Sequence, residues 1–308
     1  MTPPKPAVIV VSSLVSRGSV GGRGAVFALE RLGHRVWFVP TVWLPWHPGH
    51  GRATRIVTPA ADFAGVIDDL IGAKWLGEVG AVLTGYFAGA EAVEAAARLV
   101  AAVKACSPQS LYLCDPVLGD LRADGSGGLY VPEPTAAAIR DQLIPVADIA
   151  TPNRFELGWL TGLPVDTTAE AIAAARGLGP VTTLVTSAPA MMANAAATLL
   201  VEAAGALQAE HPLIAGAPNG TGDLMSALVL AHVLAGVGSA KALELASASV
   251  FDMVARSVRA GADELVLPQE QDVLEHSLAQ VTLRRIGEPR RPPSGLRPQQ
   301  ATQSKATD

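Results

Sequence analysis

The chain has 308 residues, of which 49% are hydrophobic, and this is enough to bury the core of one large domain or of two small ones. Its net charge of −5 gives no broad basic surface, so nucleic acid is not an expected partner. No apolar run suits a membrane span, the first predicted strand begins too early for a signal peptide, and two isolated cysteines exclude a disulfide framework, so we expect a cytoplasmic protein.

Segments typical of strands and helices alternate along most of the chain. Strands are predicted over 8–11, 35–39, 80–84, 111–114, 149–151 and 182–186, and helices over 25–33, 60–70, 90–104, 135–143, 154–161 and 168–177. Two apolar segments between 195 and 213, divided by Gly205, predict a hairpin at the sheet edge, and helices follow over 223–234 and 239–260. This order predicts an α/β fold with a mostly parallel sheet covered by helices on both faces.

The C-terminal end differs in composition from the rest. Residues 286–308 are dominated by Arg, Pro, Ser and Gln and contain almost no aliphatic side chains. A segment with so little apolar surface cannot offset the entropy of ordering. We therefore predict a single domain over residues 1–285, followed by a disordered tail.

Polar residues follow directly on five of the predicted strands. They are 12–13, 84–86, Asp115, 151–153 and 186–187. Ligands of open parallel sheets bind beyond the carboxyl ends of the strands, so these residues are expected at one shared site.

A glycine-bracketed turn, Asn219-Gly220-Thr221-Gly222-Asp223, leads directly into an apolar helix. Unpaired backbone N–H groups and the helix dipole at such a start suit a phosphate. The Asp223 carboxylate would repel a phosphate, but it suits a general base that takes the proton of an attacking hydroxyl. Ordinary helix capping explains Thr221 and Asp223 equally well.

Two further motifs supply oxygen ligands for a metal. Asp115 and Asp120 flank a turn containing Pro and Gly, and Asn153 and Glu156 stand three residues apart at a helix start. Turn and helix capping are the alternative explanation for each motif alone. Together with the glycine turn, and in the absence of Walker and dinucleotide motifs, they indicate a Mg²⁺-nucleotide site.

Over roughly residues 7–265 the sequence resembles the pyridoxal kinase family, within the ribokinase-like superfold of three αβα layers. The segment 115–120 looks like the family's Asp-Pro-Val-Met-Gly-Asp, and the segments 129–132, 147–156 and 220–223 match in the same order. The resemblance implies that ATP and Mg²⁺ phosphorylate the 5′-hydroxymethyl group of pyridoxal or a related vitamin B6 vitamer, giving pyridoxal 5′-phosphate and ADP. It also implies a homodimer.

The resemblance also implies roles for single residues. Asp223 would be the catalytic base, with the Gly220, Thr221 and Gly222 segment holding the phosphoryl charge. ATP phosphates would be bound by Thr186, Ser187 and Thr221. The metal and its waters would be held by Asn153, Asp120 and Glu156, and Asp115 would lie by that metal or by a monovalent cation such as K⁺. The vitamer would be contacted by Ser13, His47 and Tyr86.

Departures from the family pattern fall on the side that would hold the alcohol acceptor. Residues 13–21 read Ser-Leu-Val-Ser-Arg-Gly-Ser-Val-Gly, where the family usually reads Ser-His-Val-Val-Tyr-Gly-His-Val-Gly. Residues 40–49 also differ and gain Trp43 and Trp46, which either stack on a flat ring or pack the loop. For His47 an ordinary surface position in the loop is the alternative.

Three other functions remain open from the sequence. A hydroxymethylpyrimidine kinase has the same fold, but that family carries cysteine where Asp223 stands. A sugar kinase fits the 115–120 and 131–132 segments less well. A non-catalytic protein that binds vitamer or nucleotide would have no need of a base, so Asp223, Asn153 and Glu156 argue against it.

Overall fold

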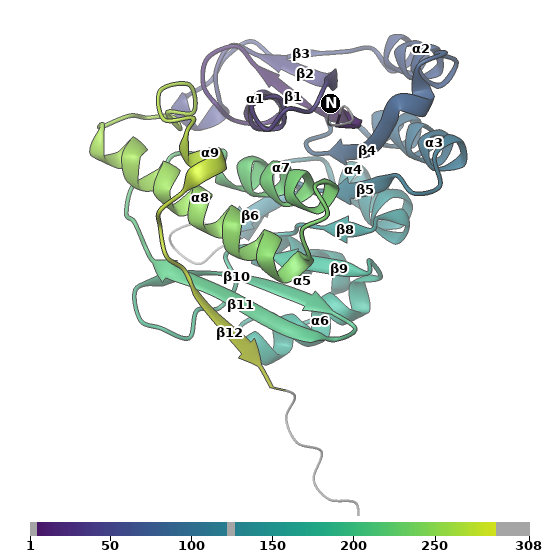
Figure 1. The fold of residues 1–308 in the computed structure, drawn as a ribbon. Coiled ribbons are helices and arrows are strands. Elements are labelled where there is room, and N and C mark those ends of the chain that lie inside the picture. The colour runs from purple at the N-terminus through teal and green to yellow at the C-terminus, as the bar shows by residue number, and fades with distance from the viewer. Residues whose placement is uncertain (1–4, 122–126, 288–308) are drawn as a thin grey trace, which may run out of the picture.

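The computed structural model describes residues 5–121 and 127–287, and its centre is a ten-stranded sheet (Figure 1). The strands of this sheet are β1 Ala7–Val15, β2 Val36–Leu44, β3 Ile56–Val57, β4 Val79–Thr84, β5 Leu111–Cys114, β8 Ile149–Ala150, β9 Thr182–Val185, β10 Ala195–Glu202, β11 Gly205–Pro212 and β12 Thr282–Ile286. A separate hairpin is formed by β6 Gly119–Leu121 and β7 Gly127–Leu129. The helices are α1 Gly22–Arg31, α2 Ala60–Ile71, α3 Ala90–Cys106, α4 Glu133–Ala138, α5 Arg154–Thr161, α6 Thr168–Leu178, α7 Thr221–Leu234, α8 Ser239–Arg259 and α9 Val273–His276.

The strand order is β12-β11-β10-β9-β8-β5-β4-β1-β2-β3. The six strands from β9 to β2 in this order run parallel, and antiparallel strands extend the sheet at both ends. The predicted hairpin is the β10–β11 pair, which joins β9 at the edge of the parallel part. The predicted α/β fold, with a mostly parallel sheet between two helical layers, is confirmed.

The two faces of the sheet are covered by different helices. On β1, Val8 and Val10 pack in one cluster with α1, α7 and α8, while Ile9 and Val11 pack in another with α2, α3 and α4. Figure 1 shows α7 and α8 crossing the near face of the sheet. Because both faces are buried, the central strands are continuous apolar runs without alternation. A third cluster joins α5 and α6 to β9, β10 and β11.

Strand β1 is longer than predicted, and this changes the place of Ser12 and Ser13. The prediction that these serines follow the strand was wrong, because β1 continues to Val15. Past Val11 the strand loses its partner β4 but keeps β2, pairing Ser12 with Pro40 and Leu14 with Trp43. The serines therefore still lie beyond the end of β4. Likewise, the first half of the 40–49 segment belongs to β2.

One edge of the sheet is strand β12, which the sequence did not predict. Strand β12 pairs with β11, and its last residue, Ile286, lies opposite Ala206. The predicted start of the tail, at residue 286, thus falls on the end of a strand, and residues 288–308 lie outside the described part of the chain. The sequence Thr-Leu-Arg-Arg-Ile lacks the apolar alternation that predicts a strand. Four of its five residues are exposed in the structure, so none of these four needs to be apolar.

Candidate active site

The start of α7 is an open anion site made of backbone groups. Gly220 precedes the helix with φ 97°, and a side chain there would come within 2.8 Å of the Ser19 carbonyl oxygen, so only glycine fits. No side chain caps this helix start. The N–H groups of Thr221 and Gly222 therefore remain for a ligand, whereas the Asp223 N–H interacts with its own carboxylate, and the dipole favours an anion there. Thr221 is half-buried and Gly222 is exposed at the same turn.

Asp223 lies in this first turn and is tied to a distant loop. Its Oδ2 accepts a hydrogen bond from the Gly21 N–H at 2.8 Å. Burial raises the pKa of Asp223 to about 6, against the opposite effect of the Gly21 hydrogen bond. A carboxylate with such a pKa is ionised at neutral pH and is a stronger base than an exposed aspartate.

Asp115 is buried close to Asp223 at the end of β5. Its Oδ2 accepts a hydrogen bond from Ser226 Oγ at 2.9 Å, and Ser226 Oγ lies 2.8 Å from Thr151 Oγ1. Burial, followed by the negative charges of Asp223 and Glu156, raises the pKa of Asp115 well above its usual range. A cation beside Asp115 would relieve this repulsion.

Asn153 and Glu156 form a capping box at the start of α5, as the alternative to a metal role predicted. Each side chain accepts the other's backbone N–H, at 2.9 Å for Asn153 Oδ1 and 2.7 Å for Glu156 Oε2. The pair also fastens the 115–120 turn, because Glu156 Oε1 accepts the Leu118 N–H at 2.8 Å and Asn153 Nδ2 donates to the Gly119 carbonyl at 2.8 Å. Burial raises the pKa of Glu156 to about 7.

A metal at this site would not sit in a cage of side chains. Within residues 5–121 and 127–287 no group of three or more His, Cys, Asp or Glu side chains is arranged to hold a metal ion. Asp120 is exposed at the start of β6, where its Oδ1 accepts the Leu121 N–H at 2.7 Å. These residues fit Mg²⁺ that takes most of its oxygen ligands from phosphates and water.

Thr186 and Ser187 also lie at the carboxyl ends of the strands. Thr186 follows β9 and forms an isolated bridge with Asn153, and its carbonyl accepts the Arg154 N–H at 3.0 Å. Ser187 is exposed and has φ 51°, which turns the chain sharply after the strand. The structure therefore brings Thr186 and Ser187 to the same edge of the sheet as Asn153.

Two of the residues predicted to contact the acceptor, Ser13 and Tyr86, lie on or just after the neighbouring strands β1 and β4. Ser13 is buried in β1, where a side chain at Gly21 would collide with its Oγ. Tyr86 follows β4, and its N–H donates to Ser12 Oγ at 3.2 Å. The Tyr86 hydroxyl accepts a hydrogen bond from Arg55 at 2.7 Å.

His47 begins a short turn, Pro48–His50, beside the start of α7. A side chain on Gly49 would come within 3.2 Å of Asn219 Nδ2, which places this turn next to the Gly220 segment. Burial lowers the pKa of His47, so the ring is neutral at pH 7. Its Nδ1 accepts the Gly49 N–H at 3.1 Å, which leaves the ring proton on Nε2.

The indole N–H groups of the two added tryptophans both have partners, Trp43 in the loop after β1 and Trp46 within its own loop. Trp43 Nε1 donates to Ser16 Oγ at 2.5 Å, and Trp46 Nε1 donates to the Gly51 carbonyl at 3.2 Å. Trp43 is 51% exposed and Trp46 37% exposed. Hydrogen bonds within the protein thus satisfy both indole N–H groups, while the exposed ring faces remain open to solvent.

Sequence reasoning missed three residues of this site. Ser226 stands one helical turn after Asp223, so a helical projection would have found it. Gly21 donates to Asp223 across 202 residues of sequence, and Glu264 contacts His50 across 214 residues. No local signal marks either of these long-range contacts.

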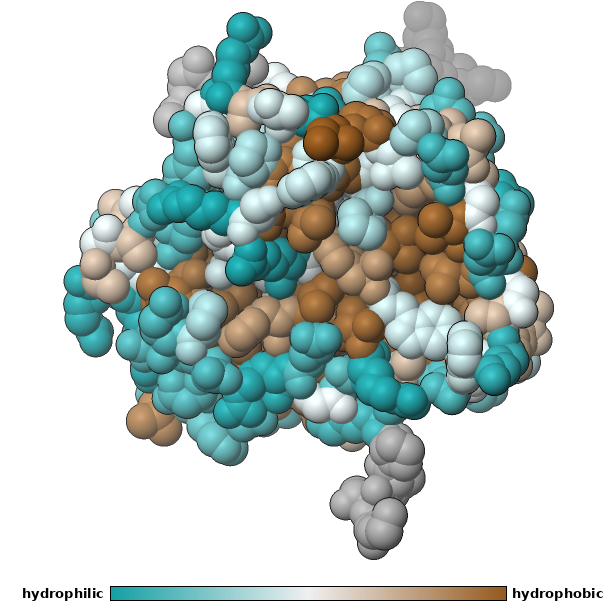
Figure 2. Space-filling view, turned by 90° about the horizontal axis from the view of Figure 1, so that it is seen from above, coloured by the Kyte–Doolittle hydropathy of each residue, from teal (hydrophilic) through white to brown (hydrophobic). Residues whose placement is uncertain are grey.

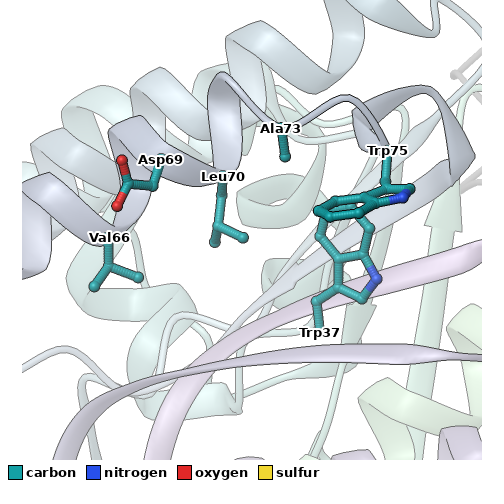
Figure 3. Close-up of a pocket in the computed structure, with 6 residues that line it drawn as sticks. All are labelled: Trp37, Val66, Asp69, Leu70, Ala73 and Trp75. Carbon is teal, nitrogen blue, oxygen red and sulfur yellow. The ribbon is translucent and has the colours of Figure 1, made fainter.

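One hollow on the surface lies away from this edge of the sheet. A cavity of about 350 Å³ is lined by Trp37, Val66, Asp69, Leu70, Ala73 and Trp75, between the start of β2 and α2 (Figure 3). Figure 3 shows Trp37, from β2, and Trp75, from the turn after α2, at one end of this hollow. Its apolar lining does not suit a triphosphate. The hollow also lies at the start of β2, which is the other edge of the sheet from the carboxyl ends of the parallel strands, so it is not the candidate active site.

The fold and the site together define a small-molecule kinase of the ribokinase-like class. Comparison with known proteins gives a match of residues 70–267 to the family described as phosphomethylpyrimidine kinase. A pyridoxal kinase of Corynebacterium diphtheriae is 37% identical over 284 residues, which are 91% of this chain and 99% of the relative.

Solved structures of pyridoxal kinases share the fold of this chain. The crystal structure of pyridoxal kinase from Entamoeba histolytica superposes with a TM-score of 0.83 at 27% identity, covering 92% of this chain and all of that one. Pyridoxal kinase from Leishmania donovani, in complex with ADP and pyridoxine, gives a TM-score of 0.82 at 27% identity and covers 91% and 99%. The chain therefore belongs to the pyridoxal kinase family, and the prediction of a kinase from its motifs is confirmed.

Proposed function

We propose that this protein transfers the terminal phosphoryl group of ATP to the 5′-hydroxymethyl group of pyridoxal or a related vitamer. The observation that carries the proposal is the place of Asp223, a partly buried carboxylate in the first turn of a helix whose N–H groups have no side-chain cap. A base and an anion site thus lie within one helical turn, as in-line phosphoryl transfer requires. Relatives and structural neighbours that are named pyridoxal kinases support the choice of acceptor.

In this mechanism Asp223 accepts the hydroxyl proton of the acceptor as its oxygen attacks phosphorus. The N–H groups of Gly220, Thr221 and Gly222 stabilise the charge on the transferring phosphoryl group. The hydrogen bond from Gly21 fixes one oxygen of Asp223 and leaves the other oxygen for the proton. Thr186, Ser187 and Thr221 bind the phosphates of ATP.

Mg²⁺ is the expected metal, and it would neutralise charge on the phosphates of ATP. Asn153, Glu156 and Asp120 would hold its water shell, since Asn153 and Glu156 also fix the backbone of the 115–120 turn. Asp115 suits a monovalent cation such as K⁺, because three carboxylates repel one another there.

Ser13, His47 and Tyr86 would contact the vitamer. The Nε2–H of neutral His47 is a donor for a phenolate or carbonyl oxygen on the pyridine ring. The Trp43 and Trp46 rings remain exposed near this side and are candidates for stacking.

A homodimer and a cytoplasmic location are also proposed. Exposed apolar side chains on β3, α2 and the turn after α2 would suit an interface between two copies; they are Ile56, Val57, Val66 and Trp75. The face seen in Figure 2 carries apolar patches among polar residues. Within the described residues, no helix combines the length and apolar character that a bilayer crossing needs.

Phosphorylation of hydroxymethylpyrimidine is a second candidate function, because the matched family model is described as phosphomethylpyrimidine kinase. The test is an ATP-consumption screen against pyridoxal, pyridoxine, pyridoxamine, hydroxymethylpyrimidine and simple sugars, with product identified by mass. We expect the highest kcat/KM with a B6 vitamer. A preference for hydroxymethylpyrimidine would favour the second candidate, and no turnover of any acceptor would contradict both.

A further inference from the structure

Two loops form the acceptor side of the site, and both meet at one buried carboxylate. The first acceptor loop is residues 16–21, which ends at the Gly21 N–H bonded to Asp223. The second acceptor loop is residues 47–50, which carries His47. Glu264, in the segment between α8 and α9, lies between these loops and is only 8% exposed.

Glu264 holds the second acceptor loop by a hydrogen bond. Its Oε1 lies 2.8 Å from His50 Nε2, and the two side chains are only 11% and 25% exposed. The negative charge of Glu264 also acts on His47, where it opposes the lowering of the pKa by burial. We infer that the position of the His47 ring depends on the contact that His50 makes with Glu264, three residues further along the loop.

The same carboxylate lies directly against the first acceptor loop. A side chain at Gly18, which has φ 107°, would come within 2.6 Å of both Glu264 oxygens. Glu264 Oε2 is buried and makes no hydrogen bond within the described residues. Burying a carboxylate in this way costs free energy of folding. The hydrogen bond to His50 is the described contact that offsets this cost.

We propose that Glu264 is a positioning residue that joins the two acceptor loops into one wall and so determines affinity for the acceptor. This inference rests on the proposed kinase function. Within the described residues Glu264 makes no hydrogen bond to the start of α7 or to the Asn153 and Glu156 pair, so its direct contacts lie on the acceptor side. Because the first loop ends at Gly21, whose N–H holds Asp223, loss of Glu264 also acts on the orientation of that base.

The test is steady-state kinetics of Glu264→Ala with the best acceptor from the screen. We expect KM for the acceptor to rise at least tenfold, while KM for ATP stays within twofold. Glu264→Gln should stay within threefold of the wild type, because an amide oxygen still accepts the His50 N–H. Gly18→Ala, which keeps Glu264 but pushes a methyl group against it, should raise the same KM at least fivefold.

Glu244→Gln is the control. It removes a carboxylate on α8 whose ion pair with Lys241 is at 2.9 Å and touches neither loop, and it should change either KM less than twofold. An unchanged acceptor KM in Glu264→Ala, or equal rises for ATP and acceptor in Glu264→Ala and Gly18→Ala, would overturn the inference. A wild type inactive with every acceptor would instead overturn the proposed function, and the inference with it.

Discussion

The proposed nucleotide side and the proposed acceptor side of the site are built in different ways. The nucleotide side consists of short motifs, each at the end of a strand or the start of a helix, such as the capping box of Asn153 and Glu156. The acceptor side is assembled from loops far apart in sequence, as the contact of His50 with Glu264 illustrates. Backbone groups and local caps thus make the part that we propose binds ATP, whereas long-range contacts shape the part that we propose selects the acceptor.

The largest effect on activity is expected from a change at Asp223, which lies between the proposed nucleotide and acceptor sides. Asp223→Asn should lower kcat by about 100-fold to 10,000-fold, because the amide cannot accept the hydroxyl proton. The Asn oxygen still accepts the Gly21 N–H, so KM for ATP and the melting temperature should change little. Asp62→Asn, an exposed acid in the first turn of α2, is the control and should keep full activity. Equal turnover in Asp223→Asn and the wild type would leave Asp223 with a capping role only.

The next largest effect tests whether the nucleotide side is a structural cap. Glu156→Ala leaves the buried Leu118 N–H and the half-buried Asn153 N–H without acceptors, and each costs on the order of 1–3 kcal/mol. We expect a loss of about 2–4 kcal/mol in the free energy of unfolding, measured in urea. The loss should shrink between pH 5 and pH 8, because a folded pKa of about 7 means that ionisation of Glu156 opposes folding in that window.

Glu170→Ala is the matched control for this variant. Glu170 forms the same capping box with Thr167 at the start of α6, on an exposed helix end. Its removal should cost about 0.5–2 kcal/mol and leave kcat unchanged. If Glu156→Ala keeps its stability but requires more Mg²⁺ for activity, the metal role outweighs the cap.

The smallest effect is expected outside both sides of the site. Deletion of residues 288–308 keeps β12 and should change kcat and the melting temperature very little, because this segment has few aliphatic residues. Deletion from residue 282 removes β12, exposes the edge of β11, and should lower the melting temperature. A large loss from the shorter deletion would show that the predicted tail packs against the domain.

The sequence predicted those parts of the molecule that depend on neighbours in the chain. Buried apolar runs such as Leu111–Cys114 gave the parallel strands, and the start of α5 was visible in Asn153 and Glu156. Strand β12 was missed because its exposed residues have no apolar pattern and its register is set by β11. The hydrogen bond from Gly21 to Asp223 and the role of Glu264 were invisible, because only the folded chain brings these residues together.

The central claim, that the Asp223 carboxylate acts as a base at the start of α7, is tested most directly by the pH dependence of kcat/KM for the acceptor, at saturating ATP and Mg²⁺. With a pKa of about 6, the ionised form predominates above pH 7 and is lost as the pH falls. We predict a plateau above pH 7 and a tenfold fall per pH unit well below pH 6, with this limb absent in Asp223→Asn. A flat profile from pH 5 to pH 8 in the wild type would contradict the account.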